Sequence, residues 1–314
     1  KQQKQIKLVE KEITIFHAKA VNQVIKKSGE NVDFIGFHGQ TIFHNAEIKI
    51  TKQLGDGNLL SQLTKKSVIY DFRQNDLKNG GQGAPLTPIF HKSLRDKFYG
   101  ESLSLIFINI GGIANATCLL KDTPMFAGDI GPGNCLIDKW IRKNSKHNYD
   151  KDGMIARSGK TNELILRQAL DNFKIPLNTS LDINEFDISF VRGLTIEDGA
   201  STLVAFTVEL IAEGIKKLLD KNKYSSGKNP LKFIVCGGGR KNKYLLELLK
   251  KKMITKYHYN QFQLIDDNNV DGDFVESQAF AFLAIRSYLK LPISFPETTG
   301  CKKPISGGII ARNY

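Results

Sequence analysis

The sequence has no long hydrophobic run. No apolar stretch approaches the ~20 residues that a membrane-spanning helix needs, and the Lys/Gln-rich start lacks the apolar core of a signal peptide. The composition of the 314 residues, 41% hydrophobic and 25% charged, is typical of a soluble globular protein with room for two ordinary domains. We therefore expect a cytoplasmic protein without a membrane partner.

Cysteine is scarce as well. The four cysteines lie too far apart for any CxxC pair; they are Cys118, Cys135, Cys236 and Cys301. Three of them have apolar or glycine-rich surroundings, where cysteine behaves as a small hydrophobic residue. This pattern argues against disulfides and against a cysteine-based metal site. The sequence assigns no metal ligands.

Negative charge is in deficit. The sequence has 45 Lys+Arg against 32 Asp+Glu, a net charge of +13, which can indicate a nucleic-acid partner or an anionic ligand. The lysines are scattered, however, and accompany many Asn and Ile residues, which favours a general bias in residue usage. Aromatic residues are not interleaved with the basic ones as a base-stacking platform requires. We expect no nucleic-acid partner; a basic nucleic-acid-binding module is an alternative that rests on charge alone.

Two common nucleotide-binding motifs are absent. No GxxxxGK[ST] segment occurs and no GxGxxG follows a first strand, which disfavours P-loop and Rossmann folds. The chain instead alternates between strand and helix patterns, as α/β proteins do. Apolar runs predict strands at 103–110, 114–120, 125–130 and 231–236, and apolar periodicity predicts helices at 11–27, 88–97, 196–219 and 275–289. Residues 98–103 mark the predicted boundary between domains 1–100 and 101–314.

Glycine is clustered at three places, each after an apolar strand. The three turns are Gly111-Gly112, Gly131-Pro132-Gly133 and Gly237-Gly238-Gly239. Glycine has no Cβ, so backbone N–H groups in such turns approach an anion closely, and a following helix N-terminus adds a favourable dipole. One such turn is more often a plain tight bend, whereas three at strand ends favour an anionic ligand.

Four charged side chains are either candidates for chemistry or structural residues. Asp129 ends a strand just before a glycine turn, where it is either presented to a ligand or an Asx-turn cap. Arg73 directly follows a strand, which suits recognition of a carboxylate or phosphate, with surface ion pairing as the alternative. Glu276 and Asp273 surround the start of the last helix. Helix capping is the preferred interpretation for Asp273, and less so for Glu276.

Seven segments of the sequence resemble the anhydro-N-acetylmuramic acid kinase family. They run in the same order as the signature segments of that family and cover nearly the whole chain, which composition alone does not produce. The segments are IGFHGQTIFH, DFRQNDLKNGGQGAPLTP, INIGGIAN, GDIGPGN, DKDGMIARSG, VCGGGRKNKYLLELL and DGDFVESQAFAFLA. The resemblance implies the α/β, actin-like ATPase fold, in which two ribonuclease-H-like domains with a cleft between them close on ATP and a sugar.

The resemblance also implies an activity. The expected enzyme is an ATP-dependent kinase that converts 1,6-anhydro-N-acetylmuramic acid into N-acetylmuramic acid 6-phosphate with hydrolytic opening of the anhydro ring, in peptidoglycan recycling. ATP and Mg²⁺ are the implied cofactors, and a homodimer is the implied assembly. By matching position, Asp129 resembles the catalytic base, and the residues implied to face the sugar are His38, Thr41, Arg73 and Glu276.

The same matching implies a nucleotide site built from the glycine turns. The segment INIGGIAN corresponds to the second phosphate hairpin of the fold, and Gly237–Gly239 resemble its adenosine motif. The glycines of the middle turn complete the set. The residues implied to bind nucleotide are Gly111, Gly112, Asn115, Gly131, Gly133, Gly237, Gly238 and Gly239.

The sequence departs from the family pattern at three places. The family opens with a strand and a Gly-Thr-Ser-x-Asp-Gly loop that holds the β- and γ-phosphates, whereas this sequence starts at Lys1 in the segment that follows. Residues 177–186 replace a segment resembling Ser-Thr-Gly-Arg-Glu, and Ile130 replaces the usual Thr. The alternative function is accordingly an inactive remnant that folds and binds a muropeptide sugar or a partner without phosphorylating it.

Overall fold

The computed structural model describes residues 2–173, 181, 183, 186–224, 231–257 and 261–314. The chain divides into two compact units: Lys1–Phe90 with Glu276–Tyr314, here unit 1, and His91–Val275, here unit 2. This division differs from the expected ranges 1–100 and 101–314, because the C-terminal segment returns to the first unit. The cleft expected between two domains stays a prediction.

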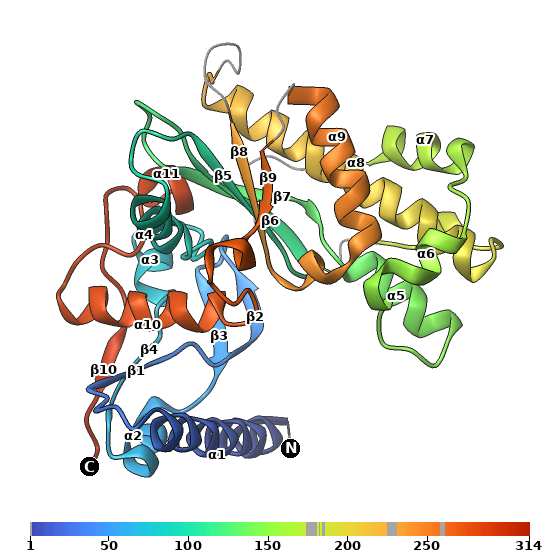
Figure 1. Cartoon of the computed structure of the whole chain (residues 1–314). Helices are drawn as coiled ribbons and strands as arrows, with labels where there is room; N and C mark the ends of the chain where they lie inside the picture. Colours follow the sequence, from blue (N-terminus) through green and yellow to red (C-terminus); the bar gives the residue numbers. More distant parts are fainter. Residues whose placement is uncertain (1, 174–180, 182, 184–185, 225–230, 258–260) are drawn as a thin grey trace. The chain divides into compact units, whose positions relative to one another are not determined.

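Unit 1 contains a three-stranded sheet and a separate hairpin (Figure 1). In the sheet, β1 (Phe34–Phe37) is parallel to β4 (Ser67–Tyr70), and β10 (Ile309–Ala311) is antiparallel to β4. The hairpin pairs β2 (Gln40–Asn45) with β3 (Ile50–Leu54). The helices are α1 (Gln2–Ser28), α2 (Gly57–Thr64), α3 (Gln74–Lys78), α10 (Val275–Tyr288) and α11 (Pro296–Thr299), with α4 (Pro88–Phe98) spanning the boundary between the units.

The sequence pattern over residues 32–44 predicts a strand followed by a loop, and the loop part of this prediction was wrong, because residues 40–45 form the hairpin strand β2. The turn before it is made by Gly39 at φ +72°, and the first four residues of β2 are exposed. A strand with both faces in solvent has no apolar alternation to reveal it in the sequence. The helix predicted at 275–289 is confirmed, and it packs so closely on β1 that a Cβ on Gly36 would lie 2.4 Å from the Phe280 carbonyl oxygen. This packing explains why the C-terminal segment belongs to unit 1.

Unit 2 is built on a five-stranded sheet with the order β7-β6-β5-β8-β9. The strands are β5 (Leu105–Ile110), β6 (Ile113–Leu119), β7 (Phe126–Pro132), β8 (Lys232–Cys236) and β9 (Phe262–Leu264). The first three form an antiparallel meander, and β8 and β9 run parallel to β5. This order and these directions are those of a ribonuclease-H-like domain, so the expected α/β class is confirmed and unit 2 has the expected domain topology.

One face of this sheet is covered by an apolar core. Ile106, Ile108 and Ile110 alternate onto that face, and the long helix α8 (Ile196–Lys221) packs against it. A Cβ on Gly214 would lie 2.1 Å from the Ile130 carbonyl oxygen, so α8 lies directly on β7. The other helices of the unit are α5 (Cys135–Asn144), α6 (Met154–Ser158), α7 (Glu163–Asn172) and α9 (Lys243–Tyr257).

Two further expectations concern the chain as a whole. Within the described ranges, no helix is both long enough and apolar enough to cross a membrane. Residues 177–186, where the sequence departs from the family pattern, lie mostly outside the described residues.

Candidate active site

A row of polar residues crosses the sheet of unit 2 at the level where β5 ends. Asn109 on β5 pairs with Asn115 on β6, and Asn115 pairs with Asp129 on β7. Residues directly opposite each other in neighbouring strands project to the same face of the sheet. All three are half-buried, whereas their strand neighbours Ile110 and Ile130 are fully buried on the core side.

A bulge in β7 places Asp129 in this row. Ala114 pairs with Gly131 while Asn115 pairs with Asp129, so Ile130 is the extra residue of β7 at this point. In an unshifted register Asn115 would lie opposite Ile130, and the Asp129 side chain would project to the apolar face. The bulge therefore turns the carboxylate toward the polar face of the sheet.

On the same face of the sheet, the preceding row of side chains, Phe107 and Thr117, is covered by a histidine. His91, at the second turn of α4, stacks on Phe107 with ring centroids 4.7 Å apart, and its Nδ1 lies 2.8 Å from the Thr117 hydroxyl. The ring is fully buried, and burial lowers the pKa of His91 to about 3. The neutral His91 ring therefore covers the side chains of Phe107 and Thr117, which lie opposite each other on β5 and β6. The row of Asn109, Asn115 and Asp129 is the next one toward the end of β5.

The Asp129 carboxylate is already held by the backbone. Its Oδ2 accepts a hydrogen bond of 2.8 Å from the Leu181 N–H. This bond fixes the orientation of the carboxylate, as a general base requires. Next to it, the buried Oδ1 of Asn115 has no hydrogen-bond partner among the described residues. A buried acceptor without a partner costs free energy, so it marks a place where a ligand or water donates.

The first two glycine turns are bonded to each other. The Gly133 N–H donates to the Gly112 carbonyl at 2.9 Å, and the Asn134 N–H donates to the Gly111 carbonyl at 2.8 Å. The Cys135 N–H also donates to the Gly112 carbonyl, at 3.2 Å. A Cβ on Gly133 would lie 2.2 Å from the Gly111 oxygen. The turn backbone was expected to be free for an oxyanion, and for these amides that expectation was wrong, because they are used inside the protein. The nucleotide role of the glycines stays a prediction.

The third turn follows β8 directly. Gly237 has φ +80°, and Gly238 begins a short 3₁₀ helix that continues to Lys241. A polar cavity of about 410 Å³ lies beside this turn and the start of α5, lined in part by Asn134, Asp138 and Gly238. Burial raises the pKa of Asp138 to about 6, and the neighbouring Arg142 opposes this shift. The cavity is thus lined by Gly238 of the third turn and by Asn134, which directly follows the second turn.

In unit 1, two of the predicted sugar residues are bonded to each other. Arg73 Nε donates to His38 Nε2 at 2.9 Å, and Arg73 Nη1 donates to the Gly83 carbonyl at 2.7 Å. His38 Nε2 is therefore an acceptor, and the ring proton is on Nδ1, which donates to the Gly39 carbonyl at 2.9 Å. Burial and the charge of Arg73 lower the pKa of His38 to about 4, so the ring is neutral at pH 7.

The loop that carries Gly83 is fixed by a buried carboxylate. Asp76 Oδ2 accepts from the Gly83 N–H at 2.6 Å, and its Oδ1 accepts from the Thr299 hydroxyl at 2.7 Å. Burial lowers the pKa of Arg73 to about 10, while Glu276 and Asp76 act in the opposite direction. Glu276, exposed at the start of α10, is thus close enough to Arg73 for its charge to matter.

Thr41 is less closely tied to this cluster. It is exposed on β2, and its hydroxyl accepts from Gln53 Nε2 at 3.2 Å. A polar cavity of about 230 Å³ in unit 1 is lined by His38 together with Lys52, Tyr70 and Asp71. The structure therefore joins His38 and Arg73 by a hydrogen bond, and the sugar-binding roles of His38, Thr41, Arg73 and Glu276 stay predictions.

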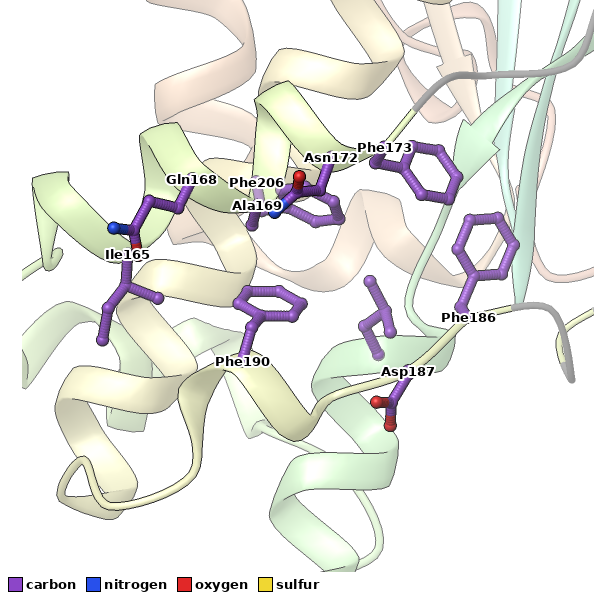
Figure 2. A pocket seen from close by; sticks show the side chains of 10 residues that line it. Ile165, Gln168, Ala169, Asn172, Phe173, Phe186, Asp187, Phe190 and Phe206 are labelled. Atoms are coloured by element: carbon purple, nitrogen blue, oxygen red, sulfur yellow. The ribbon is translucent and has the colours of Figure 1, made fainter.

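A second kind of cavity in unit 2 is aromatic rather than polar (Figure 2). It has a volume of about 360 Å³, and its aromatic lining consists of Phe173, Phe186, Phe190 and Phe206. In Figure 2 the rings of Phe173 and Phe186 face each other, 5.4 Å apart between centroids. None of the residues predicted for the site lines this cavity, and its apolar surface suits no phosphate.

Comparisons with known proteins identify the family of this chain. The family model described as anhydro-N-acetylmuramic acid kinase matches residues 1–313. The chain belongs to the anhydro-N-acetylmuramic acid kinase family. A relative of that name from Pelagibacter ubique (strain HTCC1062) is 52% identical, over 99% of this chain and 82% of the relative.

More distant relatives carry the same name. The anhydro-N-acetylmuramic acid kinase of Zymomonas mobilis is 40% identical, over 95% of this chain and 79% of the relative. That of Methylobacterium nodulans is 39% identical, over 96% and 79%. Among solved structures, the activator of the 2-hydroxyisocaproyl-CoA dehydratase from Clostridium difficile with bound ADPNP aligns over 63% of this chain with a TM-score of 0.32 and 11% identity. A likeness of that size supports no statement about ligand or fold.

Sequence reasoning missed several residues of these sites. Asn109 lies in an apolar strand and has no motif of its own, although its place in INIGG before a glycine turn was a usable signal. Asp76 and Gly83 were part of a recognised segment but were given no role. Asp273 was interpreted as a helix cap, whereas its carboxylate bonds to Arg240 and Lys241 instead.

Proposed function

We propose that the protein is an ATP-dependent kinase that converts 1,6-anhydro-N-acetylmuramic acid into N-acetylmuramic acid 6-phosphate, in cytoplasmic recycling of peptidoglycan. Membership of the anhydro-N-acetylmuramic acid kinase family over nearly the whole chain supports this proposal. The observation that carries it is Asp129, a carboxylate oriented by the Leu181 amide on the polar face of the sheet and paired with Asn115.

In this proposal Asp129 is the general base of a hydrolytic ring opening. It takes a proton from a water whose oxygen bonds to the anomeric carbon of the sugar, while the bond from that carbon to O6 breaks. The freed O6 bonds to the γ-phosphorus of ATP, and the bond from phosphorus to ADP breaks. One water, one ATP and one anhydro sugar thus give one sugar 6-phosphate, one ADP and one proton, which Asp129 releases to solvent.

The groups of unit 1 bind the sugar in this proposal. Arg73 is a fixed, desolvated guanidinium, because it is bonded to His38 and Gly83. Such a group recognises a carboxylate with a charge-assisted, geometrically specific contact, and the lactyl group of muramic acid supplies that carboxylate. The neutral His38 adds no competing positive charge.

ATP and Mg²⁺ are the cofactors of the proposed reaction. Mg²⁺ bound to the phosphates neutralises charge during phosphoryl transfer. Among the described residues, no group of three His, Cys, Asp or Glu side chains could hold a metal ion. Mg²⁺ in phosphoryl-transfer sites is held mainly by phosphates and waters. Asn115 Oδ1, which has no hydrogen-bond partner among the described residues, would accept a hydrogen bond from one of those waters.

The decisive experiment measures where the oxygen of ¹⁸O-labelled water appears in the reaction products. The full-length gene product is incubated with Mg-ATP and 1,6-anhydro-N-acetylmuramic acid in ¹⁸O-labelled water, and the products are analysed by mass spectrometry. We expect N-acetylmuramic acid 6-phosphate with one label on the anomeric oxygen and none on the phosphate. Label in free phosphate, without a phosphorylated sugar, would show an ATPase and contradict the proposal. Light scattering of the same sample tests the homodimer.

A further inference from the structure

The turn after β8 lies directly on the end of β5. A Cβ on Gly237 would lie 2.5 Å from Asn109 Oδ1, and one on Gly239 would lie 2.3 Å from the Ile110 side chain. The turn closes by hydrogen bonds from the Arg240 N–H to the Gly237 carbonyl and from the Asn242 N–H to the Gly239 carbonyl, at 3.2 and 3.0 Å. Close contact fixes one side of this turn.

The other side of the turn is held by the Arg240 side chain, which is only 5% exposed. Its Nη1 donates to the Gly237 carbonyl at 3.2 Å. Its Nε and Nη2 donate to the two oxygens of Asp266 at 2.8 and 3.3 Å, and Nη2 also lies 2.9 Å from Asp273 Oδ1. One planar guanidinium therefore connects the turn to two carboxylates.

The segment from Asp266 to Asp273 closes over this guanidinium. A Cβ on Gly272 would lie 2.1 Å from Arg240 Nε, and the Gly272 N–H donates to Asp266 Oδ1 at 3.1 Å. Lys241 bonds to the second oxygen of Asp273 at 2.6 Å, which balances part of the negative charge. Burial works against the charge of Arg240, but its hydrogen bonds to Asp266 and Asp273 raise the Arg240 pKa overall.

We infer that Arg240 is a positioning residue that holds the Gly237–Gly239 turn and the segment Asp266–Asp273 as one rigid element. The inference rests on the proposed function in one respect, namely that a nucleotide binds at this turn. A turn that is already fixed loses less conformational entropy when a ligand binds, so its affinity for the ligand is higher. Two residues beyond Asp273 the chain leaves unit 2, at Val275.

The geometry requires arginine rather than any cation. The guanidinium makes three differently directed contacts, to a backbone carbonyl and to two carboxylates. A lysine ammonium is a single point on a flexible stem and cannot reach all three partners at once. Arg240→Lys therefore keeps the charge and removes the positioning.

The test compares Arg240→Lys with a matched control, Arg95→Lys. Arg95 is another buried arginine of unit 2, with a side chain 9% exposed and an ion pair of 2.8 Å to Asp96. Among the described residues its side chain forms no hydrogen bond or ion pair with the turn. Hydrogen–deuterium exchange of the ligand-free protein measures the amides of the turn and of Asn242. Calorimetry with Mg²⁺ and a non-hydrolysable ATP analogue measures nucleotide affinity, calorimetry with the anhydro sugar measures sugar affinity, and urea unfolding measures stability.

We expect Arg240→Lys to speed exchange in the turn and to weaken nucleotide binding roughly 10- to 100-fold, the range for loss of a charged hydrogen bond, with little change in sugar affinity. Arg95→Lys should lose stability without either effect. Asp266→Asn, a milder change, should shift exchange and affinity in the same direction by less. Unchanged exchange in Arg240→Lys, or equal changes in Arg95→Lys, would overturn the inference. Faster exchange in a protein whose wild type binds no nucleotide would support the positioning role and refute the proposed function.

Discussion

At the scale of single residues, Arg73 is part of the framework of its site as well as a candidate ligand contact. Two of its guanidinium nitrogens are committed to His38 and to the Gly83 carbonyl. These two bonds set the plane of the guanidinium before any ligand binds. The unfavourable free energy of removing it from water is part of the folding free energy and not of the binding free energy. A preorganised cation of this kind discriminates between ligands by their negative charge.

The first prediction concerns Arg73→Ala. We expect sugar affinity to fall by ~1.5 to 3 kcal/mol, because a charge-assisted hydrogen bond is lost, while nucleotide affinity changes little. Isothermal titration with each ligand separately gives the two numbers. Arg312→Ala, at an exposed arginine of the same unit, is the control and should change neither. Equal losses for both ligands in Arg73→Ala would mean that Arg73 is only structural.

The second prediction concerns Asp129→Asn. The amide oxygen of Asn still accepts from the Leu181 N–H, so the side chain stays in place, but the proton acceptor is gone. Turnover should fall by ~10² to 10⁴ with little change in sugar affinity. Steady-state kinetics of the full-length protein measures this, with Asp171→Asn on the exposed face of α7 as the control. Near-normal turnover would leave Asp129 with a purely structural role beside Gly131.

At the scale of elements, the hairpin turn of β5 and β6 and the start of α5 act as one piece. Three N–H groups at the start of α5 donate to the carbonyls of Gly111 and Gly112. Helix α5 has no side-chain cap at its N-cap residue Asn134, so these carbonyls satisfy donors that a helix start leaves open. The glycines here serve close backbone packing.

The third prediction tests this packing with Gly133→Ala. The added Cβ would lie 2.2 Å from the Gly111 oxygen, a backbone atom that cannot move without opening the hairpin. We expect a loss of ~1 to 3 kcal/mol in the free energy of unfolding, the usual range for overpacking. Gly112→Ala is the matched control, because the nearest atom to its Cβ would be 3.5 Å away. Urea unfolding compares the two, and equal stabilities would contradict the packing role.

At the scale of the whole molecule, stability depends on histidines that fold in the neutral form. His91 and His38 have pKa values of about 3 and about 4, mainly because of burial, against an ordinary value of 6.5. Between these values the unfolded chain binds protons that the folded chain does not. The stability contributed by folding these two histidines in the neutral form is therefore fully present above about pH 6.5. It is lost as the pH drops toward 4 for His38 and toward 3 for His91.

The fourth prediction follows from this sign. The free energy of unfolding should fall between pH 6.5 and pH 4.5 by at most about 1.4 kcal/mol per pH unit for each such histidine. His91→Gln should reduce the slope, because Gln bears no titrating proton. His147→Gln, at an exposed histidine, should leave it unchanged. Urea unfolding at several pH values measures the slope, and identical slopes for wild type and His91→Gln would refute the assignment.

The sequence by itself determined the α/β class, four strands of the five-stranded sheet (β5 to β8), the helices α8 and α10, and the family. These features are encoded locally: buried strands are continuous apolar runs, helices carry apolar periodicity, and glycine turns punctuate them. The sequence pattern predicted that β7 ends at residue 130, because Gly131 and Pro132 are ordinarily turn residues. In the structure the strand continues to Pro132. Site residues such as Asp129 and Arg73 could be predicted because they lie in segments that resemble the motifs of the family.

Only the tertiary structure decided what those candidates touch. The row that contains Asp129 depends on a one-residue bulge at Ile130, and a shift of one residue in register moves a side chain to the opposite face of a sheet. The bond from Arg73 to His38 joins residues 35 positions apart, and Arg240 meets Asp266 and Asp273 from another element. Contacts between distant residues follow from the packing of whole elements, so no local pattern in the sequence records them.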